Sequence, residues 1–327
     1  GCTSQHRFRV HILRADRVRH NEMIDTSQIL VIGSINTDLV VNASKLPTPG
    51  ETVLGDSSFI NLGGKGANQA VAAARLGANV SMVGCVGSDD FGKQAVAGLR
   101  AENIDCSHLT RVGSVPTGIA LISVDRAGLN QITVAPGANR FICKETINEA
   151  FHAAPKNTTI LLQLEIPIDS VNYAVQLGRA RDCRVILDPA PAQKLPSFLY
   201  ENVSLITPNA SEAEVLTDCP VANVDDARKA ADKLQKLGCE HVILTLGEAG
   251  ALVQSNGVCT LVEAPAVVTQ DTTAAGDCFN GALATALVEG AELIDAAEFA
   301  CQAAAISTTK SGAQSSMPKR NEVAHSI

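Results

Sequence analysis

The chain has 327 residues, of which 46% are hydrophobic and 18% are charged, and its formal net charge is −8 at pH 7. This length and apolar content allow one large α/β domain or two modest ones, and they exclude disorder over most of the chain. The acidic balance argues against nucleic acid or an anionic membrane as the main partner, and no apolar run approaches the roughly 18 residues that span a bilayer.

The first 22 residues differ in composition from the rest. They carry five Arg and three His but only two acids, and they lack the continuous apolar stretch of a secretory signal. A transit peptide, a disordered tail and translated sequence ahead of a start at Met23 are three interpretations, and the weak transit pattern favours the latter two. We expect an N-terminal extension over residues 1–27, a folded domain over 28–320 and a C-terminal tail over 321–327.

Short segments rich in Val and Ile alternate with helical patterns along the folded part. Such nearly continuous apolar runs are typical of strands that are buried on both faces. The expected strands are 29–33, 79–84, 158–164, 183–188, 203–207 and 241–247. The expected helices are 66–77, 93–104, 170–180 and 224–238. This alternation predicts an α/β fold with a doubly wound, mainly parallel sheet that is flanked by helices.

Two segments depart from the alternation. Residues 39–63 contain several turn-forming Pro and Gly residues, and residues 115–135 contain two alternating apolar runs on either side of a polar turn. We expect both segments to form a small antiparallel β lid over the main domain. Such a lid leaves strand edges unpaired, and pairing with a second copy would cover them, so we expect a homodimer through the lid.

Ten cysteines are scattered through the chain, and none forms a C-x-x-C pair. This distribution points to neither a zinc ribbon nor a thioredoxin-type site. Several of the cysteines lie within apolar runs, as buried free thiols do. The pattern therefore favours a reducing cytoplasm over a disulfide framework.

Polar residues and glycines are concentrated directly after four of the expected strands. In an open parallel sheet, ligands bind beyond the carboxyl ends of the strands. Turn formation and helix capping are the alternative roles for some of these residues, but a lone Glu165 after an apolar run is costly to bury without a partner. The residues at the four strand ends are Ser34, Asn36 and Asp38, then Glu165, then Asn209 and Glu212, then Thr245, Gly247, Glu248 and Gly250.

A glycine-rich segment, NLGGKGANQAVAAARLG, begins the first expected helix. It lacks the G-x-x-x-x-G-K-[ST] pattern of a P-loop and does not complete the G-x-G-x-x-G spacing of a dinucleotide site. Gly63, Gly64 and Gly66 would let the backbone approach a ligand closely, while Lys65 and Asn68 add hydrogen-bond donors. A polyol suits such a surface, and a plain turn before a core helix is the alternative.

A second segment of this kind, DTTAAGDCFNGALATAL, joins very small residues to a carboxylate, Asp277, at the start of an apolar helix. Small side chains let an anion reach the free N–H groups of a helix start, where the helix dipole also favours negative charge. The alternative is a helix cap, because Asp and Gly are common at helix starts.

The chain resembles the ribokinase-like (PfkB) family of sugar kinases. The resemblance rests on GGKGANQAVAAARLGA and DTTAAGDCFNGAL, with TPNASEAE between them, and it extends over about residues 28 to 318. Within the family, the members that phosphorylate ribose are the most similar, through GSINTDLV, PTPGET, LLQLEIP, DPAPA and KSGAQSS. The resemblance implies transfer of the γ-phosphoryl group of ATP to the 5-hydroxyl of D-ribose, with Mg²⁺ bound to the nucleotide.

The resemblance also implies roles for individual residues. Asp277 would be the catalytic base beside an anion hole at Ala274, Ala275 and Gly276. The sugar would be held by Ser34, Asn36, Asp38, Gly63, Gly64, Lys65, Asn68, Glu165 and Asp277. ATP would be bound by Asn209, Thr245, Gly247, Glu248, Gly250, Gly276 and Cys301. Glu212 would act on Mg²⁺ indirectly, through water.

The family resemblance further implies activation by K⁺. Its ligands would come from Asp271, Thr273, Ser307, Lys310, Gly312 and Ser316. Hard oxygen ligands with one carboxylate suit this ion, whereas a flexible loop over 308–316 is the alternative.

Two cysteines depart from the commonest family pattern. Cys301 lies where His or Asn is more usual near the adenine, and Cys278 follows the catalytic Asp where Thr is common, which leaves the nucleotide preference open. Three other functions remain as alternatives: a kinase for another sugar such as deoxyribose, a sugar-binding regulator without catalysis, and a nucleotide-binding structural protein.

Overall fold

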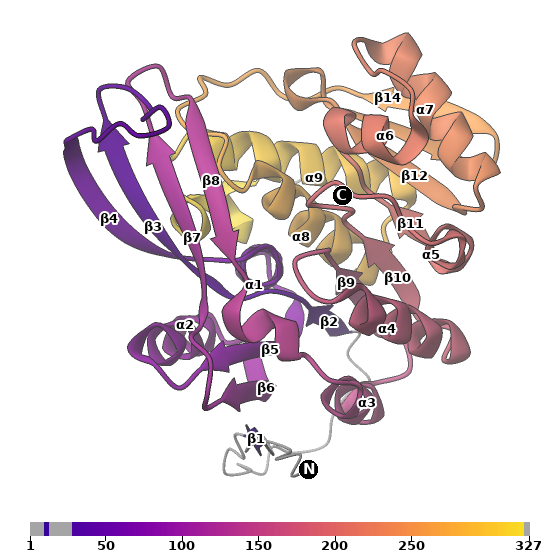
Figure 1. Cartoon of the computed structure of the whole chain (residues 1–327). Helices are drawn as coiled ribbons and strands as arrows, with labels where there is room; N and C mark the ends of the chain where they lie inside the picture. Colours follow the sequence, from indigo (N-terminus) through magenta and orange to yellow (C-terminus); the bar gives the residue numbers. More distant parts are fainter. Residues whose placement is uncertain (1–9, 13–27, 324–327) are drawn as a thin grey trace, which may run out of the picture.

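The computed structural model describes residues 10–12 and 28–323, which form one ten-stranded sheet with helices on both faces and a second sheet of four strands (Figure 1). From one edge to the other, the strands of the large sheet are β1 (Val10–Ile12), β6 (Asp105–Val112), β5 (Asn79–Gly87), β2 (Gln28–Ile32), β9 (Thr159–Leu162), β10 (Arg184–Leu187), β11 (Leu205–Ile206), β12 (His241–Thr245), β13 (Ala251–Ser255) and β14 (Val258–Val262). All neighbours from β6 to β12 are parallel, and the pairs at both edges are antiparallel.

Helices cover both faces of this sheet. One face carries α1 (Lys65–Arg75), α2 (Asp90–Ala101), α8 (Ala275–Val288) and α9 (Leu293–Thr308). The other face carries α3 (Lys144–Ala153), α4 (Ile168–Ala180), α5 (Ser197–Asn202), α6 (Ala210–Thr217) and α7 (Val224–Lys236). The predicted doubly wound α/β fold is therefore confirmed.

Strand β2 illustrates why the central strands have continuous apolar sequences. Ile29 and Val31 pack into the core beneath α1 and α8, while Leu30 and Ile32 pack into the core on the opposite face. Successive side chains of a strand point to opposite faces, so a strand between two helical layers needs an apolar residue at every position.

The four-stranded sheet stands away from the helical layers (Figure 1). Its order is β4 (Gly55–Gly63), β3 (Asn36–Ala43), β7 (Gly118–Val124) and β8 (Asn130–Ala135). The pairs β3–β4 and β7–β8 are antiparallel, as the sequence predicts for the lid, and the central pair β3–β7 is parallel. Strand β3 begins at Asn36 rather than near residue 39, so Asn36 and Asp38 are residues of the lid itself.

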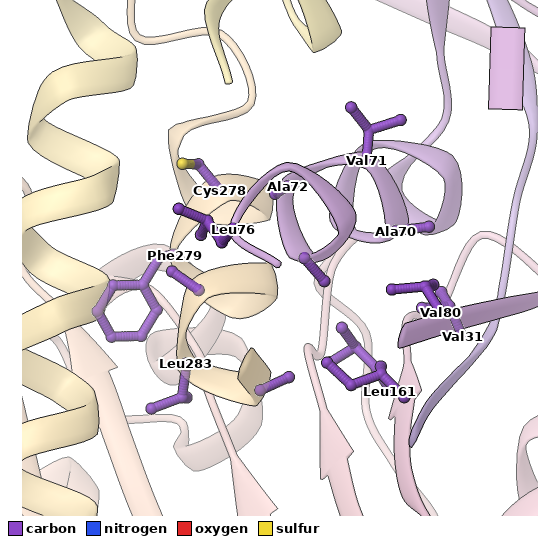
Figure 2. Packing of buried hydrophobic residues seen from close by; sticks show 14 of the residues in the cluster. Val31, Ala70, Val71, Ala72, Leu76, Val80, Leu161, Cys278, Phe279 and Leu283 are labelled. Atoms are coloured by element: carbon purple, nitrogen blue, oxygen red, sulfur yellow. The ribbon is translucent and has the colours of Figure 1, made fainter. Parts of the chain in front are cut away.

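Helices α1 and α8 lie side by side in the core, where Ala72 of α1 and Leu76, directly after α1, approach Cys278 and Phe279 of α8 (Figure 2). Their close approach depends on Gly281. A Cβ atom at Gly281 would lie 2.7 Å from the backbone oxygen of Gln69. This contact fixes the distance between the two helices that carry the glycine-rich segment and Asp277.

The predicted extension over residues 1–27 lies mostly outside the described residues; within them, β1 pairs with the edge of β6. The predicted C-terminal tail over residues 321–327 lies partly outside the described residues; within them, Arg320–Glu322 form a 3₁₀ turn and Val323 is buried. Within the described part of the chain, no helix has the length and apolar content that crossing a bilayer requires.

Candidate active site

The candidate site lies at the switch point of the large sheet, where later strands are added on opposite sides of β2. Strand β2 lies between β5 and β9, and the chain leaves its carboxyl end for the lid before it returns to form β5. Because β2 and β9 are parallel neighbours, their carboxyl ends meet at the same edge, where a crevice forms in open α/β sheets. This arrangement brings Ser34 and Asn36, which follow β2, to Glu165, which follows β9.

Glu165 is the centre of the first polar cluster. Its Oε2 atom accepts hydrogen bonds from Ser34 Oγ at 2.5 Å, Asn36 Nδ2 at 3.3 Å and the backbone N–H of Lys65 at 3.2 Å. These donors satisfy the carboxylate that the sequence identified as costly to bury.

Asn139 belongs to the same cluster, although the sequence analysis missed it. Its Nδ2 donates to Asn36 Oδ1 at 2.7 Å, and its Oδ1 accepts from the backbone N–H of Ile35 at 2.9 Å. Asn139 lies in a 3₁₀ turn, η1 (Gly137–Phe141), more than a hundred positions along the chain from Asn36. No local pattern marks it, because its partners are supplied only by the tertiary fold.

Asp38 extends from lid strand β3 and is 8% exposed. Burial, with smaller contributions from the nearby carboxylates Glu165 and Asp277, raises its pKa to about 7. The carboxylate packs against Gly63, where a Cβ atom would lie 2.3 Å from Asp38 Oδ2.

The other glycines of the glycine-rich segment also lie in close contact with backbone atoms of neighbouring segments. Gly64 has φ of +91°, a conformation that other residues rarely adopt, and a Cβ there would lie 2.6 Å from the backbone nitrogen of Asn36. A Cβ at Gly66 would lie 2.7 Å from the backbone of Gly33. The glycines therefore let α1 and the lid approach the end of β2, a role that the sequence analysis did not foresee.

A cavity of about 790 Å³ lies between the lid and two loops of the main domain. Its lining includes Asp38 and Asn61 from the lid, residues 269–274 ahead of α8, and residues 311–313 after α9. Polar and apolar lid side chains share this surface, since Phe59 and Ile132 also line it.

Asp277 lies in the first turn of α8, within the helix rather than at its cap. The cap position is Ala274, which has left-handed backbone geometry with φ of +58° and makes no side-chain cap hydrogen bond. The first hydrogen bond of the helical pattern runs from Cys278 N to Ala274 O. The preceding amides of Gly276 and Asp277 therefore have no partner in the helix, which is the arrangement that binds anions.

The carboxylate of Asp277 is held from helix α1. Its Oδ2 accepts from Asn68 Nδ2 at 2.9 Å, and its Oδ1 accepts from Gln69 Nε2 at 3.1 Å. Gln69 also donates to Asp188 Oδ2 at 2.7 Å and accepts from Gln163 Nε2 at 2.6 Å. The sequence did not identify Gln69, Asp188 or Gln163 as site residues, although Gln69 lies inside the glycine-rich segment and Asp188 directly follows β10.

A small cavity of about 180 Å³ adjoins the start of α8, and Lys65 lines it together with Asp188, Asn209 and Glu212. Burial disfavours the charged form of Lys65, but four surrounding carboxylates outweigh it and raise the pKa of its ammonium above the ordinary value. Those carboxylates are Asp277, Asp188, Glu165 and Glu212. Lys65 thus lies beside the start of α8, where free amides can bind an anion. The predicted contact of Lys65 with the sugar stays a prediction.

Asn209 and Glu212 form a capping box at the start of α6. Asn209 Oδ1 accepts from Glu212 N at 2.9 Å, and Glu212 Oε2 accepts from Asn209 N at 2.8 Å. The alternative role of Asn209 as a helix cap is therefore observed. Both residues also line the small cavity beside Lys65, so the cap places them at the site.

All but one of the residues predicted to bind nucleotide line a third cavity of about 490 Å³, and the exception, Asn209, lines the small cavity beside Lys65. The predicted members of its lining are Thr245, Gly247, Glu248, Gly250, Gly276 and Cys301. The remaining lining is largely apolar and includes residues 264–267 and Phe279, which the sequence analysis did not identify.

Asp271 connects the two loops that flank the large cavity through hydrogen bonds. Its Oδ1 accepts from the N–H and Oγ1 of Thr273 at 2.9 Å and 2.6 Å, and its Oδ2 accepts from Gly312 N at 2.8 Å. Burial opposes the charge, but these hydrogen bonds hold the pKa of Asp271 below its ordinary value.

Apart from Thr273, the other predicted K⁺ ligands lie in the last turn of α9 and in the chain that follows it. Ser307 Oγ and Ser316 Oγ donate to backbone carbonyls, and Lys310 Nζ pairs with Glu322. Among the described residues, no group of three or more His, Cys, Asp or Glu side chains is arranged to hold a metal ion.

Comparison with known proteins gives a consistent result. A model of the pfkB family of carbohydrate kinases matches residues 26–320. A ribokinase of Haemophilus influenzae is 42% identical over 294 residues, which cover 90% of this chain and 96% of that protein. A deoxyribokinase of Salmonella typhi is 37% identical over 291 residues, which cover 89% and 95%.

The fold is also shared with solved structures. The structure of Arabidopsis thaliana ribokinase complexed with ribose and ATP has a TM-score of 0.83 and 32% identity, and the match covers 91% of this chain and 97% of that one. Taken with the family match over most of the chain, this likeness leads to one conclusion: the chain belongs to the pfkB family of carbohydrate kinases.

Proposed function

We propose that this chain transfers the γ-phosphoryl group of ATP to the 5-hydroxyl of D-ribose and so forms D-ribose 5-phosphate. The observation that supports this most directly is the position of Asp277. Its carboxylate lies in the first turn of α8, beside the free amides of the helix start, and it is near enough to Asp38 to contribute to the raised pKa of that group. A hydroxyl on one side and a phosphoryl group on the other would meet at this residue.

In the proposed reaction, Asp277 orients the sugar hydroxyl and takes its proton as the new O–P bond forms and the bond to the ADP oxygen breaks. The amides of Gly276 and Asp277, with the ammonium of Lys65, would stabilise the negative charge of the transferring group. Bound Mg²⁺ would supply further charge neutralisation, and Asn209 and Glu212, which line the small cavity, would hold its water shell.

Two features support a polyol as the acceptor. The cavity beneath the lid contains a carboxylate and an amide side chain, Asp38 and Asn61, which can pair with hydroxyl groups. In addition, no described residue donates a hydrogen bond to the buried Oδ1 atom of Asn68, beside Asp277. A sugar hydroxyl would satisfy this acceptor.

A kinase for deoxyribose is the second candidate, because a deoxyribokinase is among the similar relatives. ADP release measured with ribose, 2-deoxyribose, fructose and adenosine separates the two. A higher kcat/KM for ribose supports the proposal, whereas a higher value for 2-deoxyribose supports the second candidate. ADP release that no sugar stimulates would contradict both.

Protonation of Asp38 is expected to make ribose binding depend on pH. Since the pKa of Asp38 is raised to about 7, the group is mostly neutral at lower pH and ionised at higher pH. A hydroxyl donates more strongly to the ionised form, so KM for ribose should fall by up to about tenfold between about pH 6 and about pH 8. Kinetic measurements across this range, at saturating ATP, check the expectation.

The matched variants are Asp38→Asn, which is neutral at every pH, and Asp56→Asn, which alters an exposed carboxylate of the lid. The first should lose the pH dependence of KM, and the second should keep it. Persistence of the dependence in Asp38→Asn would contradict its assignment to Asp38.

We also propose K⁺ as an activating ion near Asp271. The available groups are oxygens, with one carboxylate held in its ionised form, and these suit a hard monovalent cation. K⁺ would order the loop ahead of α8, so that the anion-binding amides are in place before ATP arrives. Activity should rise about fivefold or more with K⁺, the factor that ~1 kcal/mol of ordering corresponds to.

The measurement compares K⁺, Na⁺ and Li⁺ at constant ionic strength, because salt also screens ATP binding. Asp271→Ala should remove most of the K⁺ response and leave the KM for ribose largely intact. Equal stimulation by K⁺ and Li⁺, or a full K⁺ response in the variant, would contradict the site.

Two further proposals concern the oligomeric state and the cellular location of the protein. A homodimer through the lid is supported by Ile60 and Leu121, which lie in one row across the sheet and are 58% and 51% exposed. Sedimentation equilibrium measures the oligomeric state directly.

A reducing, cytoplasmic location is supported by the nine cysteines of the described residues, which are all free thiols.

A further inference from the structure

Gln69 has an unusual position for a buried glutamine. Its side chain is fully buried on helix α1, and its amide nitrogen lies within hydrogen-bond distance of two carboxylates. The distances are 3.1 Å to Asp277 Oδ1 and 2.7 Å to Asp188 Oδ2. An amide NH₂ has two hydrogens, so one donor group can serve both carboxylates at once.

The orientation of this amide is set from its other end. Gln163, also fully buried, donates from Nε2 to Gln69 Oε1 at 2.6 Å. With its oxygen engaged in this way, the Gln69 amide directs its nitrogen toward the carboxylates. The chain of contacts therefore runs from Gln163 through Gln69 to Asp188 and Asp277.

The backbone of Gln69 is fixed as well. A Cβ atom at Gly281 of α8 would lie 2.7 Å from Gln69 O, so the two helices are in close contact at this residue. Asp277 lies one turn earlier on α8. The donor and its acceptor are thus carried by two helices that have little freedom to move apart.

The carboxylates of Asp188 and Asp277 repel each other when both are ionised, and they lie near each other in a buried region. Burial is the main cause that raises the pKa of Asp188, and the neighbouring carboxylates Glu212 and Asp277 add to the effect. A shared donor offsets this repulsion and holds each group in place. Without it, the carboxylate of Asp277 would keep only its contact with Asn68.

We propose that Gln69, held by Gln163, is a positioning residue that fixes the carboxylate of Asp277 for proton transfer. With Gln69 on Oδ1 and Asn68 on Oδ2, rotation of the carboxylate is restricted, while each oxygen keeps a lone pair for the sugar hydroxyl. This inference rests on the proposed function, since the hydroxyl is that of the acceptor sugar. The alternative is that Gln69 only fills the core.

The test compares Gln69→Leu with Gln254→Leu. Gln254 is a matched control because it is also buried and donates a side-chain hydrogen bond, to Gln235 at 3.0 Å, but lies on β13 outside the site. Gln69→Leu should lower kcat by about 10- to 100-fold with KM for ribose changed less than about twofold, because misplacement of a reacting group affects turnover rather than binding. Gln254→Leu should leave both constants near the parent values, even if its melting temperature falls.

A double-mutant cycle with Asp277→Asn tests whether Gln69 acts through the carboxylate. In that background, Gln69→Leu should lower kcat by less than about twofold further, because the group that it positions is absent. Independent effects of the two changes would overturn the proposal. So would a kcat of Gln69→Leu equal to that of Gln254→Leu, or an effect confined to KM.

If Gln69→Leu does not fold, as circular dichroism would reveal, Gln163→Met provides the second variant. It removes the donor to Gln69 Oε1 and leaves both carboxylate contacts available, so kcat should fall by about three- to tenfold at unchanged KM. An unchanged kcat in this variant would overturn the proposal. Failure of the parent protein to phosphorylate any sugar would instead contradict the proposed function itself.

Discussion

Replacing Asp277 with Asn is expected to lower kcat by about 10²-fold or more while the protein remains folded. Asn has nearly the same size as Asp but cannot accept the hydroxyl proton, and general acid–base groups typically contribute factors of this order. KM for ribose should change little, since Asp38, Asn36 and the cluster around Glu165 remain. Steady-state ADP release with ribose, together with a thermal melt, measures both properties.

The control for this variant is Asp90→Asn. Asp90 is also an acidic residue in the first turn of a helix, α2, but it is exposed and lies outside the site. Both changes remove a favourable interaction with a helix dipole, so the comparison separates that loss from catalysis. Turnover by Asp277→Asn at nearly the parent rate would contradict the assigned role of the carboxylate.

The second large effect is expected from Lys65→Met. The long apolar side chain of Met replaces the stem of Lys but removes the charge that faces Asp188, Glu212 and Asp277. Because these carboxylates would then repel the phosphates of ATP without compensation, kcat should fall by about 10²- to 10³-fold and KM for ATP should rise. KM for ribose should move much less, which separates a phosphate role from a sugar role.

Lys93→Met is the matched control, because Lys93 is an exposed lysine on α2 whose only described ion pair is with Asp90. It should behave as the parent protein. A Lys65→Met variant whose main defect is a raised KM for ribose would support Lys65 as a sugar contact and contradict its role in binding phosphate.

The local patterns of the sequence were sufficient for the framework of the molecule. Continuous apolar runs such as that of β2 predicted a parallel sheet between two helical layers, because only a strand covered on both faces needs an apolar side chain at every position. The small residues before Asp277 predicted a helix start open to an anion, and Ala274 and Gly276 provide it. The family resemblance, confirmed by the match over residues 26–320, added the class of reaction.

The roles of several residues depend on contacts that no local pattern contains. Asn139 and Gln69 reach partners about 100 to 200 positions away, and Gln163 is a single polar residue within an apolar strand end. The sequence predicted a sugar contact for Lys65, which stays a prediction, but it gave no sign that the fold would surround this side chain with carboxylates from four distant segments.

The sequence by itself thus determined the sheet, its helices and the carboxylate at the start of α8, because periodicity and helix-start chemistry act between near neighbours in the chain. Only the tertiary structure decided why Gly63 and Gly66 are glycines, which carboxylates surround Lys65, and how Gln69 meets Asp277. These features are distances between side chains from separate elements. They exist only once helices α1 and α8 and the lid have packed against the ends of β2 and β9.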